Sequence, residues 1–221
     1  MRLCEPCDSL RLGEKKLKID FHAPLLCGID EAGRGPLAGP VCAAAVILGK
    51  GFPVLRLDDS KKLSPASREN LKDVIYRAAA AWGLGWVPAW EIDEINIHNA
   101  SLLAMKRAFE AMCEAMREAV RPESSFSADG GNIRAVVDGK FTPDIPVPCE
   151  ALVKADSKVE EVMAASILAK TARDRLMEYY SLFYPEYGYE KHKGYPTKAH
   201  RQAVMLWGPS PIQRMSFACR L

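Results

Sequence analysis

Two apolar segments of this chain are separated by a short stretch rich in acids and glycines. Residues 24–29 and 41–48 are apolar, and residues 30–40 read Asp-Glu-Ala-Gly-Arg-Gly-Pro-Leu-Ala-Gly-Pro. Short apolar runs bounded by glycine and proline are typical of buried strands. Because only a tight turn separates the two runs, we expect antiparallel neighbours. The fold must therefore place two carboxylates at the end of a buried strand.

The same stretch has the composition of a site for a divalent cation beside a phosphate. Side chains of a regular strand alternate between faces, but a strand end leading into a glycine turn can bring Asp30 and Glu31 to one point. Gly33 and Gly35 lack a Cβ atom and would let another molecule approach the backbone. Arg34 can pair with a phosphate. The pattern favours a metal-dependent phosphodiester site over its alternative, a solvated acidic turn.

The motif at residues 28–41 resembles the signature of the ribonuclease HII family, the type 2 ribonucleases H. Later segments resemble that family in the same order, so the resemblance extends from Leu25 to Phe217. The related type 3 enzymes usually carry lysine in place of Arg34. The resemblance implies a ribonuclease-H-like α/β fold, with a mixed sheet of about five strands flanked by helices and a small helical C-terminal part.

Two more acids lie next to predicted element ends. Residues 133–137 form a β-branched run that ends at Asp138, just before a glycine. A second carboxylate at the same end of a parallel pair of strands would face the first. Asp156 precedes a predicted helix, because Ser157 and Glu160 fit a capping box. Without the resemblance, Asp156 could equally serve only to cap that helix.

The resemblance assigns roles to these acids and to two further family segments. It implies that Asp30, Glu31, Asp138 and Asp156 are catalytic and hold two Mg²⁺ or Mn²⁺ ions, with Asp30 contacting both. It also implies that a tyrosine of the Lys-Gly-Tyr-Pro-Thr segment stacks on the sugar at an RNA–DNA junction. The residues expected to contact substrate are Gly33, Arg34, Gly35, Ser60, Lys61, Lys62, Tyr195 and Thr197.

Each of these substrate contacts has a simpler alternative. Residues 60–62 could be a solvated loop before a helix, and Tyr195 could be a half-buried surface aromatic. Pro196 stands where the family usually has glycine, which stiffens the segment. We interpret His192 and His200, which lie in basic surroundings, as phosphate contacts or solvated side chains and not as metal ligands.

The activity implied by the family is metal-dependent hydrolysis of the RNA strand of RNA–DNA hybrids. It includes cleavage 5′ to a single ribonucleotide embedded in duplex DNA, leaving a 3′-hydroxyl and a 5′-phosphate. A ribonuclease-H-like DNA junction nuclease is one alternative; it would share the acids but not the Gly-Arg-Gly turn or the Tyr195 segment. A non-catalytic nucleic-acid-binding module is another, although no required acid is missing from the sequence.

Other patterns predict helices and one more strand. A helix begins after Ser64, residues 84–89 read as a strand, and Asn99 caps a long helix that reaches residue 120. Thr197 caps a helix that ends at Gly208.

Composition and charge complete the expectations. We expect a lead-in at residues 1–22, a catalytic domain at 23–183, and a basic, helical substrate-binding segment at 184–221. From residue 191 onward there are six Lys and Arg and no Asp or Glu, which fits binding of a polyanion at that end. No apolar run is long enough to span a membrane, so we expect no membrane partner. The polar, charged N-terminus is no secretory signal, so we expect a cytoplasmic location. We also expect a monomer.

Overall fold

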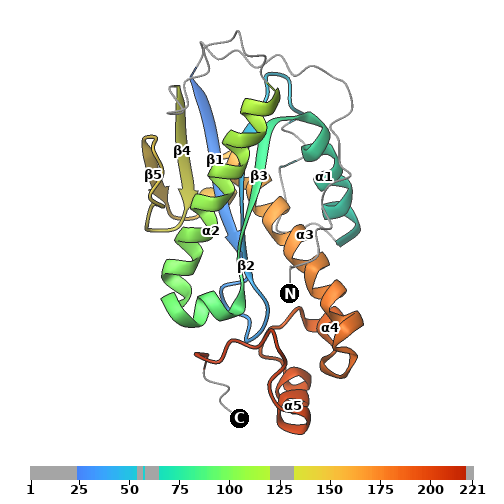
Figure 1. Cartoon of the computed structure of the whole chain (residues 1–221). Helices are drawn as coiled ribbons and strands as arrows, with labels where there is room; N and C mark the ends of the chain where they lie inside the picture. Colours follow the sequence, from blue (N-terminus) through green and yellow to red (C-terminus); the bar gives the residue numbers. More distant parts are fainter. Residues whose placement is uncertain (1–23, 54–56, 58–64, 120–131, 218–221) are drawn as a thin grey trace.

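A five-stranded mixed sheet forms the centre of the molecule. The computed structural model describes residues 24–53, 57, 65–119 and 132–217. Within this part of the chain, the strands follow the order β3-β2-β1-β4-β5, as Figure 1 shows. Their bounds are β1 (Leu25–Ala32), β2 (Val41–Leu48), β3 (Ala79–Val87), β4 (Ile133–Asp138) and β5 (Cys149–Leu152).

Helices cover both faces of the sheet. The long α2 packs on β1, β2 and β3, while α3 packs on β1 and β2 and contacts α1 (Figure 1). Two shorter helices lie in the C-terminal part, where the chain turns away from the sheet. The helices are α1 (Pro65–Ala78), α2 (Ala89–Ala119), α3 (Glu160–Phe183), α4 (Tyr189–His192) and α5 (Lys198–Trp207).

Strand pairing follows the sequence expectation where it matters for the acids. β1 and β2 are antiparallel, with Asp30 opposite Ala44. β1 and β4 are parallel and in register from Leu25 opposite Ile133. β4 pairs in parallel with β5 on its other side. The mixed five-stranded sheet implied by the resemblance is therefore confirmed.

The side chains of β2 pack into a core on each face of the sheet. Alternate side chains of a strand point to opposite faces. Val41, Ala43 and Ala45 join the core beneath α2, whereas Ala44 and Val46 join the core beneath α1 and α3. Small alanines in the middle of β2 let both helical layers approach the central strands closely.

The predicted starts of β3 and α2 differ from the structure. β3 begins at Ala79, five residues before its predicted start. α2 begins at Ala89 and is kinked at Asn96, where φ is 65° and ψ is 162°. The Asn96 side chain accepts hydrogen bonds from the backbone N–H groups of His98 and Asn99, at 3.0 and 3.1 Å. Asn96, and not Asn99, is therefore the residue that caps the second half of this helix.

The predicted capping box before α3 is wrong. The N-cap of α3 is Val159, and no side chain caps the helix there. Ser157 instead ends a short 3₁₀ helix, η2 (Ala155–Ser157), and its hydroxyl donates to the carbonyl of Lys154. Lys154 itself has a left-handed backbone. The chain therefore makes an extra turn around Asp156 before α3 begins.

The C-terminal part packs on the end of the sheet through a small core of its own. Ala38, Met177, Tyr187 and Tyr189 form that core. Thr197 is the N-cap of α5, as predicted: its Oγ1 accepts from the N–H of His200 at 3.2 Å. The predicted cap at Ser64 lies outside the described residues. Among the residues described, no helix is both long and apolar enough to cross a membrane.

The contact between β3 and α2 yields a stability prediction. A Cβ atom at Gly85 would overlap the backbone carbonyl oxygen of Ala104 in α2, and backbone cannot move aside cheaply. We expect Gly85→Ala to lower the free energy of unfolding by about 3 kcal/mol. The matched control is Gly49→Ala, whose Cβ would lie 3.6 Å from its nearest neighbour, the Cβ of Ala80, and should change stability little. Urea unfolding measures both; equal stabilities would contradict the packing.

Candidate functional site

The two acids at the carboxyl end of β1 have different partners. Asp30 is 6% exposed, accepts a hydrogen bond from the N–H of Glu31 at 2.8 Å, and is hydrogen-bonded to Ser166 of α3. Glu31 pairs with Arg34, with Nη1 and Oε1 3.1 Å apart. The two neighbouring carboxylates therefore have different local surroundings.

Asp138 ends β4, directly beside the end of β1. Its Oδ1 accepts a hydrogen bond from the N–H of Ala155 at 2.8 Å, which ties β4 to the turn that carries the next acid. Gly139 follows with φ of 125°, a conformation that side chains disfavour, and lets the chain leave the sheet sharply. The parallel pairing of β1 and β4 thus brings two acids to one edge, as predicted.

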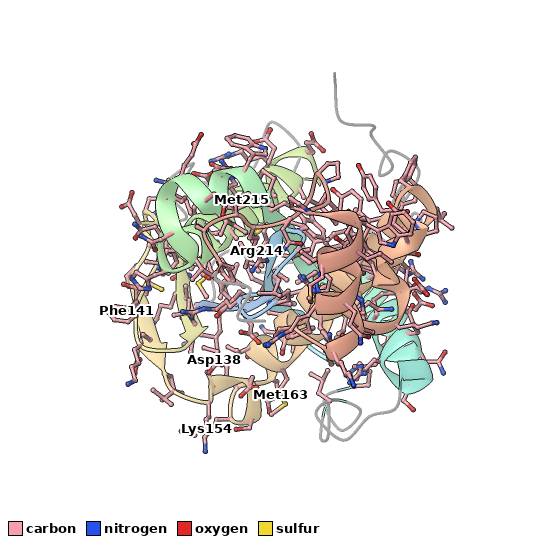
Figure 2. The ribbon with its side chains drawn as sticks, turned by 90° about the horizontal axis from the view of Figure 1, so that it is seen from below. Asp138, Phe141, Lys154, Met163, Arg214 and Met215 are labelled. Carbon is pink, nitrogen blue, oxygen red and sulfur yellow. The ribbon has the colours of Figure 1, made fainter. Side chains whose placement is uncertain are left out.

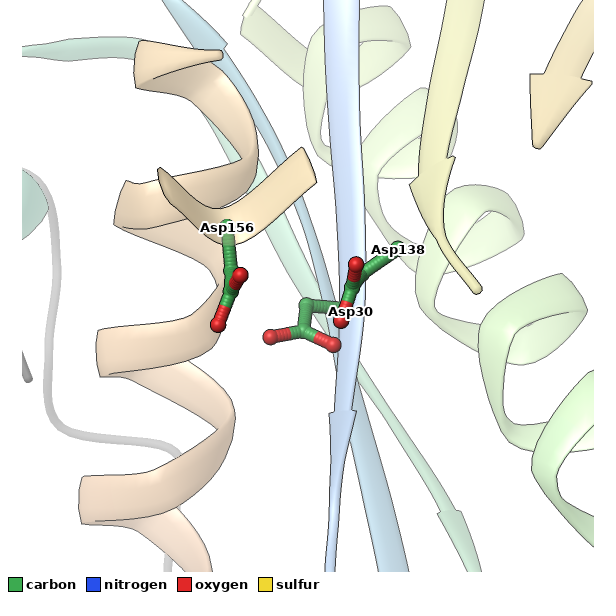
Figure 3. Close-up of side chains that lie close together, drawn as sticks. All are labelled: Asp30, Asp138 and Asp156. Carbon is green, nitrogen blue, oxygen red and sulfur yellow. The ribbon is translucent and has the colours of Figure 1, made fainter. Parts of the chain in front are cut away.

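Asp156 completes a cluster of three carboxylates. It lies in η2, ahead of α3, and is 9% exposed. One carboxylate oxygen from each of Asp30, Asp138 and Asp156 lies within 4.8 Å of the other two. Figure 3 shows the three side chains pointing toward one another from β1, β4 and η2. Glu31 lies beside this cluster but outside the group of three.

Negative charge accumulates in this cluster. Burial raises the pKa of Asp30 well above its usual range, and the neighbouring carboxylates of Glu31 and Asp138 raise it further. A hydrogen bond from Ser166 on α3 acts in the opposite direction. Burial also raises the pKa of Glu31, although Arg34 opposes it. A bound cation would relieve both effects.

The donor set fits a divalent cation. Carboxylate oxygens are the ligands that Mg²⁺, Mn²⁺ and Ca²⁺ prefer. Oε2 of Glu31 is buried and has no hydrogen-bond partner among the described residues. Neither Asp30 nor Asp138 forms an ion pair within the described ranges of the chain. The cluster therefore offers hard oxygen ligands to a cation.

The turn at residues 33–40 lies next to the acids and is sharply folded. Gly33 and Gly39 have φ of 96° and 83°, where a side chain would be strained. The side chain of Arg34 is 51% exposed and available to solvent on the rim of the site. Whether another molecule approaches the backbone at Gly33 and Gly35, as the sequence suggests, stays a prediction.

The segment at residues 193–197, called here the Tyr195 segment, lies against this turn. The N–H of Leu37 donates to the carbonyl of Gly194 at 2.8 Å. A Cβ atom at Gly35 would lie 3.7 Å from Cε1 of Tyr195, so the ring faces Gly35. Tyr195 is 39% exposed. The structure thus brings together the two segments expected to contact substrate, although they are far apart in sequence.

Two histidines support the Tyr195 segment from below. His200 is fully buried, and its Nδ1 lies 3.0 Å from the carbonyl oxygen of Tyr195. His192 stacks on it with ring centroids 4.6 Å apart, and its Nε2 lies 2.8 Å from the carbonyl of Tyr187. Burial lowers the pKa of both rings. The interpretation of His200 as a phosphate contact or solvated residue is therefore wrong. Its ring is buried and supports the backbone at Tyr195.

Sequence reasoning missed three polar residues near the site. Ser166 hydrogen-bonds Asp30 from α3, and Arg173 and Arg214 are both fully buried under the turn at residues 33–40. Arg173 is four residues from both Ala169 and Met177, which are buried on the same face of α3. An arginine on an apolar helix face was the available signal. The predicted contacts Ser60, Lys61 and Lys62 lie outside the described residues.

Comparison with known proteins identifies the family. The sequence matches the family profile described as Ribonuclease HII over residues 27–220. It is 54% identical over 196 residues to the ribonuclease HII of Treponema denticola, covering 87% of this chain and 98% of that protein. The chain belongs to the ribonuclease HII family.

Solved structures of ribonuclease HII enzymes share the fold. The crystal structure of ribonuclease H2 from Pyrococcus horikoshii superposes with a TM-score of 0.64 at 26% identity, covering 88% of this chain and 94% of that one. Ribonuclease HII from Archaeoglobus fulgidus, solved in complex with PCNA, gives a TM-score of 0.63 at 26% identity, covering 89% and 96%.

Family membership establishes the reaction class. As a member of this family, the chain is a metal-dependent hydrolase that acts as an endoribonuclease on RNA–DNA hybrids. The matches support neither of the alternatives, a DNA junction nuclease or a non-catalytic binding module. The buried acidic cluster at the ends of β1 and β4 agrees with metal dependence.

The charge of the cluster leads to a prediction for the protein in EDTA. Asp30→Asn should raise the free energy of unfolding at neutral pH, because it removes a buried negative charge while its side-chain oxygen can still accept from the N–H of Glu31. A raised pKa in the folded state means that Asp30 favours folding at low pH and opposes it as pH rises above the unfolded pKa.

The gain should therefore be larger at pH 7.5 than at pH 4. Asp144→Asn is the control, since Asp144 is an exposed carboxylate that pairs with Lys106 at 2.8 Å and is not part of the cluster. Urea unfolding of the three proteins gives the answer. If the Asp30→Asn variant were less stable than the wild type in EDTA, the buried negative charge of Asp30 would not be destabilising the folded protein.

Proposed function

We propose that Asp30, Glu31, Asp138 and Asp156 together hold two Mg²⁺ or Mn²⁺ ions. The main observation behind this proposal is that Asp30, Asp138 and Asp156 converge: one carboxylate oxygen from each lies within 4.8 Å of the other two. The unpartnered Oε2 of Glu31 beside them supports a role for the fourth acid. When bound, two such ions would activate a water molecule and stabilise the leaving oxygen of the phosphodiester.

The turn at residues 33–40 and the Tyr195 segment would then select the substrate. Only a 2′-hydroxyl distinguishes RNA from DNA at the cut site. The backbone at Gly33, Arg34 and Gly35 would hydrogen-bond that hydroxyl, and the exposed guanidinium of Arg34 would pair with a phosphate. Tyr195, which faces Gly35, would stack on the next sugar. The cut would fall 5′ to the ribonucleotide and leave a 3′-hydroxyl and a 5′-phosphate.

Other parts of the chain would bind the phosphate backbone. The hydroxyl of Thr197 is exposed and uses its oxygen for the cap of α5, which leaves its proton for a phosphate. We retain Ser60, Lys61 and Lys62 as proposed phosphate contacts. The substrates would be RNA–DNA hybrids and duplex DNA that contains ribonucleotides. The proposal includes a monomeric enzyme in the cytoplasm, which gel filtration and cell fractionation would test.

A duplex with one embedded ribonucleotide tests the proposed metal site directly. We expect cleavage in Mg²⁺ or Mn²⁺, none in EDTA, and a loss in Asp30→Asn on the order of 100-fold or more in kcat. The Asp144→Asn variant, which alters an exposed carboxylate paired with Lys106, should cleave like the wild type. Gel analysis of end-labelled strands would locate the cut and its termini. Full activity of Asp30→Asn would rule out this role for the cluster.

Tyr195 yields a separate prediction about the junction. Replacing it with alanine removes the stacking surface and should lower kcat/KM on the embedded ribonucleotide by about 10-fold or more. Tyr195→Phe keeps the ring and should retain most of the activity. Tyr179→Ala is the matched control, because Tyr179 is 41% exposed, close to the 39% of Tyr195, but lies on the outside of α3. Unchanged junction cleavage by Tyr195→Ala would show that the ring does not contact substrate.

A further inference from the structure

Arg214 is buried beneath the turn at residues 33–40 and binds its backbone. Its side chain is 0% exposed. The guanidinium donates to the carbonyls of Gly33 at 2.6 Å, Arg34 at 3.0 Å, Pro36 at 2.9 Å and Gly39 at 2.8 Å. Every nitrogen of one guanidinium is thus committed to the same turn. Seen from below, Arg214 lies toward the centre of the molecule, with Phe141 and Lys154 at the periphery (Figure 2).

Arg173 joins that turn to the Tyr195 segment. Also 0% exposed, it donates from Nε to the carbonyl of Pro40 at 3.0 Å and from Nη2 to that of Ala38 at 3.2 Å. Its third nitrogen, Nη1, donates to the carbonyl of Lys193 at 3.0 Å. The guanidinium carbon lies 5.9 Å from the centre of the Tyr195 ring. One side chain therefore contacts both segments that are proposed to read the substrate.

Burying the two guanidinium groups in this position costs free energy of folding. Burial lowers the pKa of both, in Arg214 to about 9, and the proximity of Arg173 contributes to the shift in Arg214. Within the described ranges, neither guanidinium forms an ion pair with a carboxylate; both are satisfied by neutral carbonyls. Apolar side chains of similar volume usually stabilise a core as well as buried charges do. What the guanidinium adds is a rigid planar fork that fixes several acceptors at once.

The turn has little freedom to relax around this fork. Six of its eight carbonyls accept from the two guanidinium groups, and the carbonyl of Leu37 accepts from the N–H of Arg214. A Cβ atom at Gly33 would overlap the side chain of Arg173, and one at Gly194 would lie 2.5 Å from the carbonyl oxygen of Ala38. The glycines of both segments are therefore needed to let the arginines and the two chains approach.

We propose that Arg173 and Arg214 are positioning residues that fix the distance between the turn at residues 33–40 and the ring of Tyr195, and so determine selectivity for a ribonucleotide joined to DNA. This inference rests on the proposed function, in which the turn reads the 2′-hydroxyl and Tyr195 reads the next sugar. A continuous hybrid presents ribose at both positions. A single embedded ribonucleotide presents ribose followed by deoxyribose. Its cleavage therefore depends most on the distance between the turn at residues 33–40 and the ring of Tyr195.

Lysine substitutions test the proposal with the charge retained. An ammonium group is a single donor centre and cannot span the carbonyls that the guanidinium fork reaches. Arg173→Lys and Arg214→Lys should lower kcat/KM on a duplex with one ribonucleotide about 10-fold more than on a continuous RNA–DNA hybrid. The matched control is Arg175→Lys, two residues from Arg173 on α3, which pairs with Glu69 at the surface and should leave both rates unchanged.

A purely structural role predicts a different result. Loss of folded protein would lower both rates by the same factor, in step with a lower Tm, and an unchanged ratio of the two rates would overturn the proposal. The proposed function itself is judged on the wild type and on Asp30→Asn, so its failure is distinguishable from failure of this inference.

Hydrogen exchange of the wild type keeps the proposal testable if the lysine variants do not fold. The N–H of Leu37 donates to the carbonyl of Gly194 across the two segments. The N–H groups of Gly39 and Arg214 donate to the carbonyls of Ile212 and Leu37, which joins the turn to the segment of chain that carries Arg214. They should exchange at one common, slow rate, together with the N–H of Tyr195. Fast exchange confined to residues 37 and 39 would show that the turn moves independently of the Tyr195 segment, and would overturn the proposal.

Discussion

The parallel pairing of β1 with β4 is the interaction on which the site depends. It places Asp30 and Asp138 at the same end of neighbouring strands, although 107 positions separate them in the numbering of the chain. The hydrogen bond from Ala155 to Asp138 then fixes the turn that carries Asp156. A one-residue shift of this register would turn Asp30 to the opposite face of the sheet. The cluster is therefore a product of backbone pairing before it is a product of side-chain chemistry.

Charge of both signs is buried on either side of the turn at residues 33–40. The clustered acids lie at the ends of β1 and β4 and in η2, while Arg173 and Arg214 lie beneath the turn. The guanidinium groups donate to the carbonyls of the turn and so orient its peptide groups. A substrate phosphate and a cation, each of the appropriate sign, would enter a region whose polarity is already set. This arrangement explains why so many polar groups are tolerated inside a small core.

Sequence patterns predicted the elements that depend on neighbouring residues. The β1 and β2 strands, the turn between them, Asp138 at a strand end and the Thr197 cap each follow from neighbouring residues, and the resemblance supplied the mixed sheet. The capping box at Ser157 failed because Lys154 adopts a left-handed conformation and starts an extra 3₁₀ turn. Arg173 and Arg214 were missed because their partners are carbonyls from distant turns, and a carbonyl is common to every residue. His200 was misread because basic neighbours in sequence do not indicate burial.

The location of Arg214 near the end of the described chain has a consequence for synthesis on the ribosome. The hairpin of β1 and β2 is local and can form early, but the turn between the strands is secured only by a side chain more than 170 residues later. A nascent polypeptide that has emerged only through β4 carries Asp30 and Asp138 but not the guanidinium that binds four carbonyls of the turn at residues 33–40. The turn can therefore reach its supported conformation only after Arg214 has been synthesised.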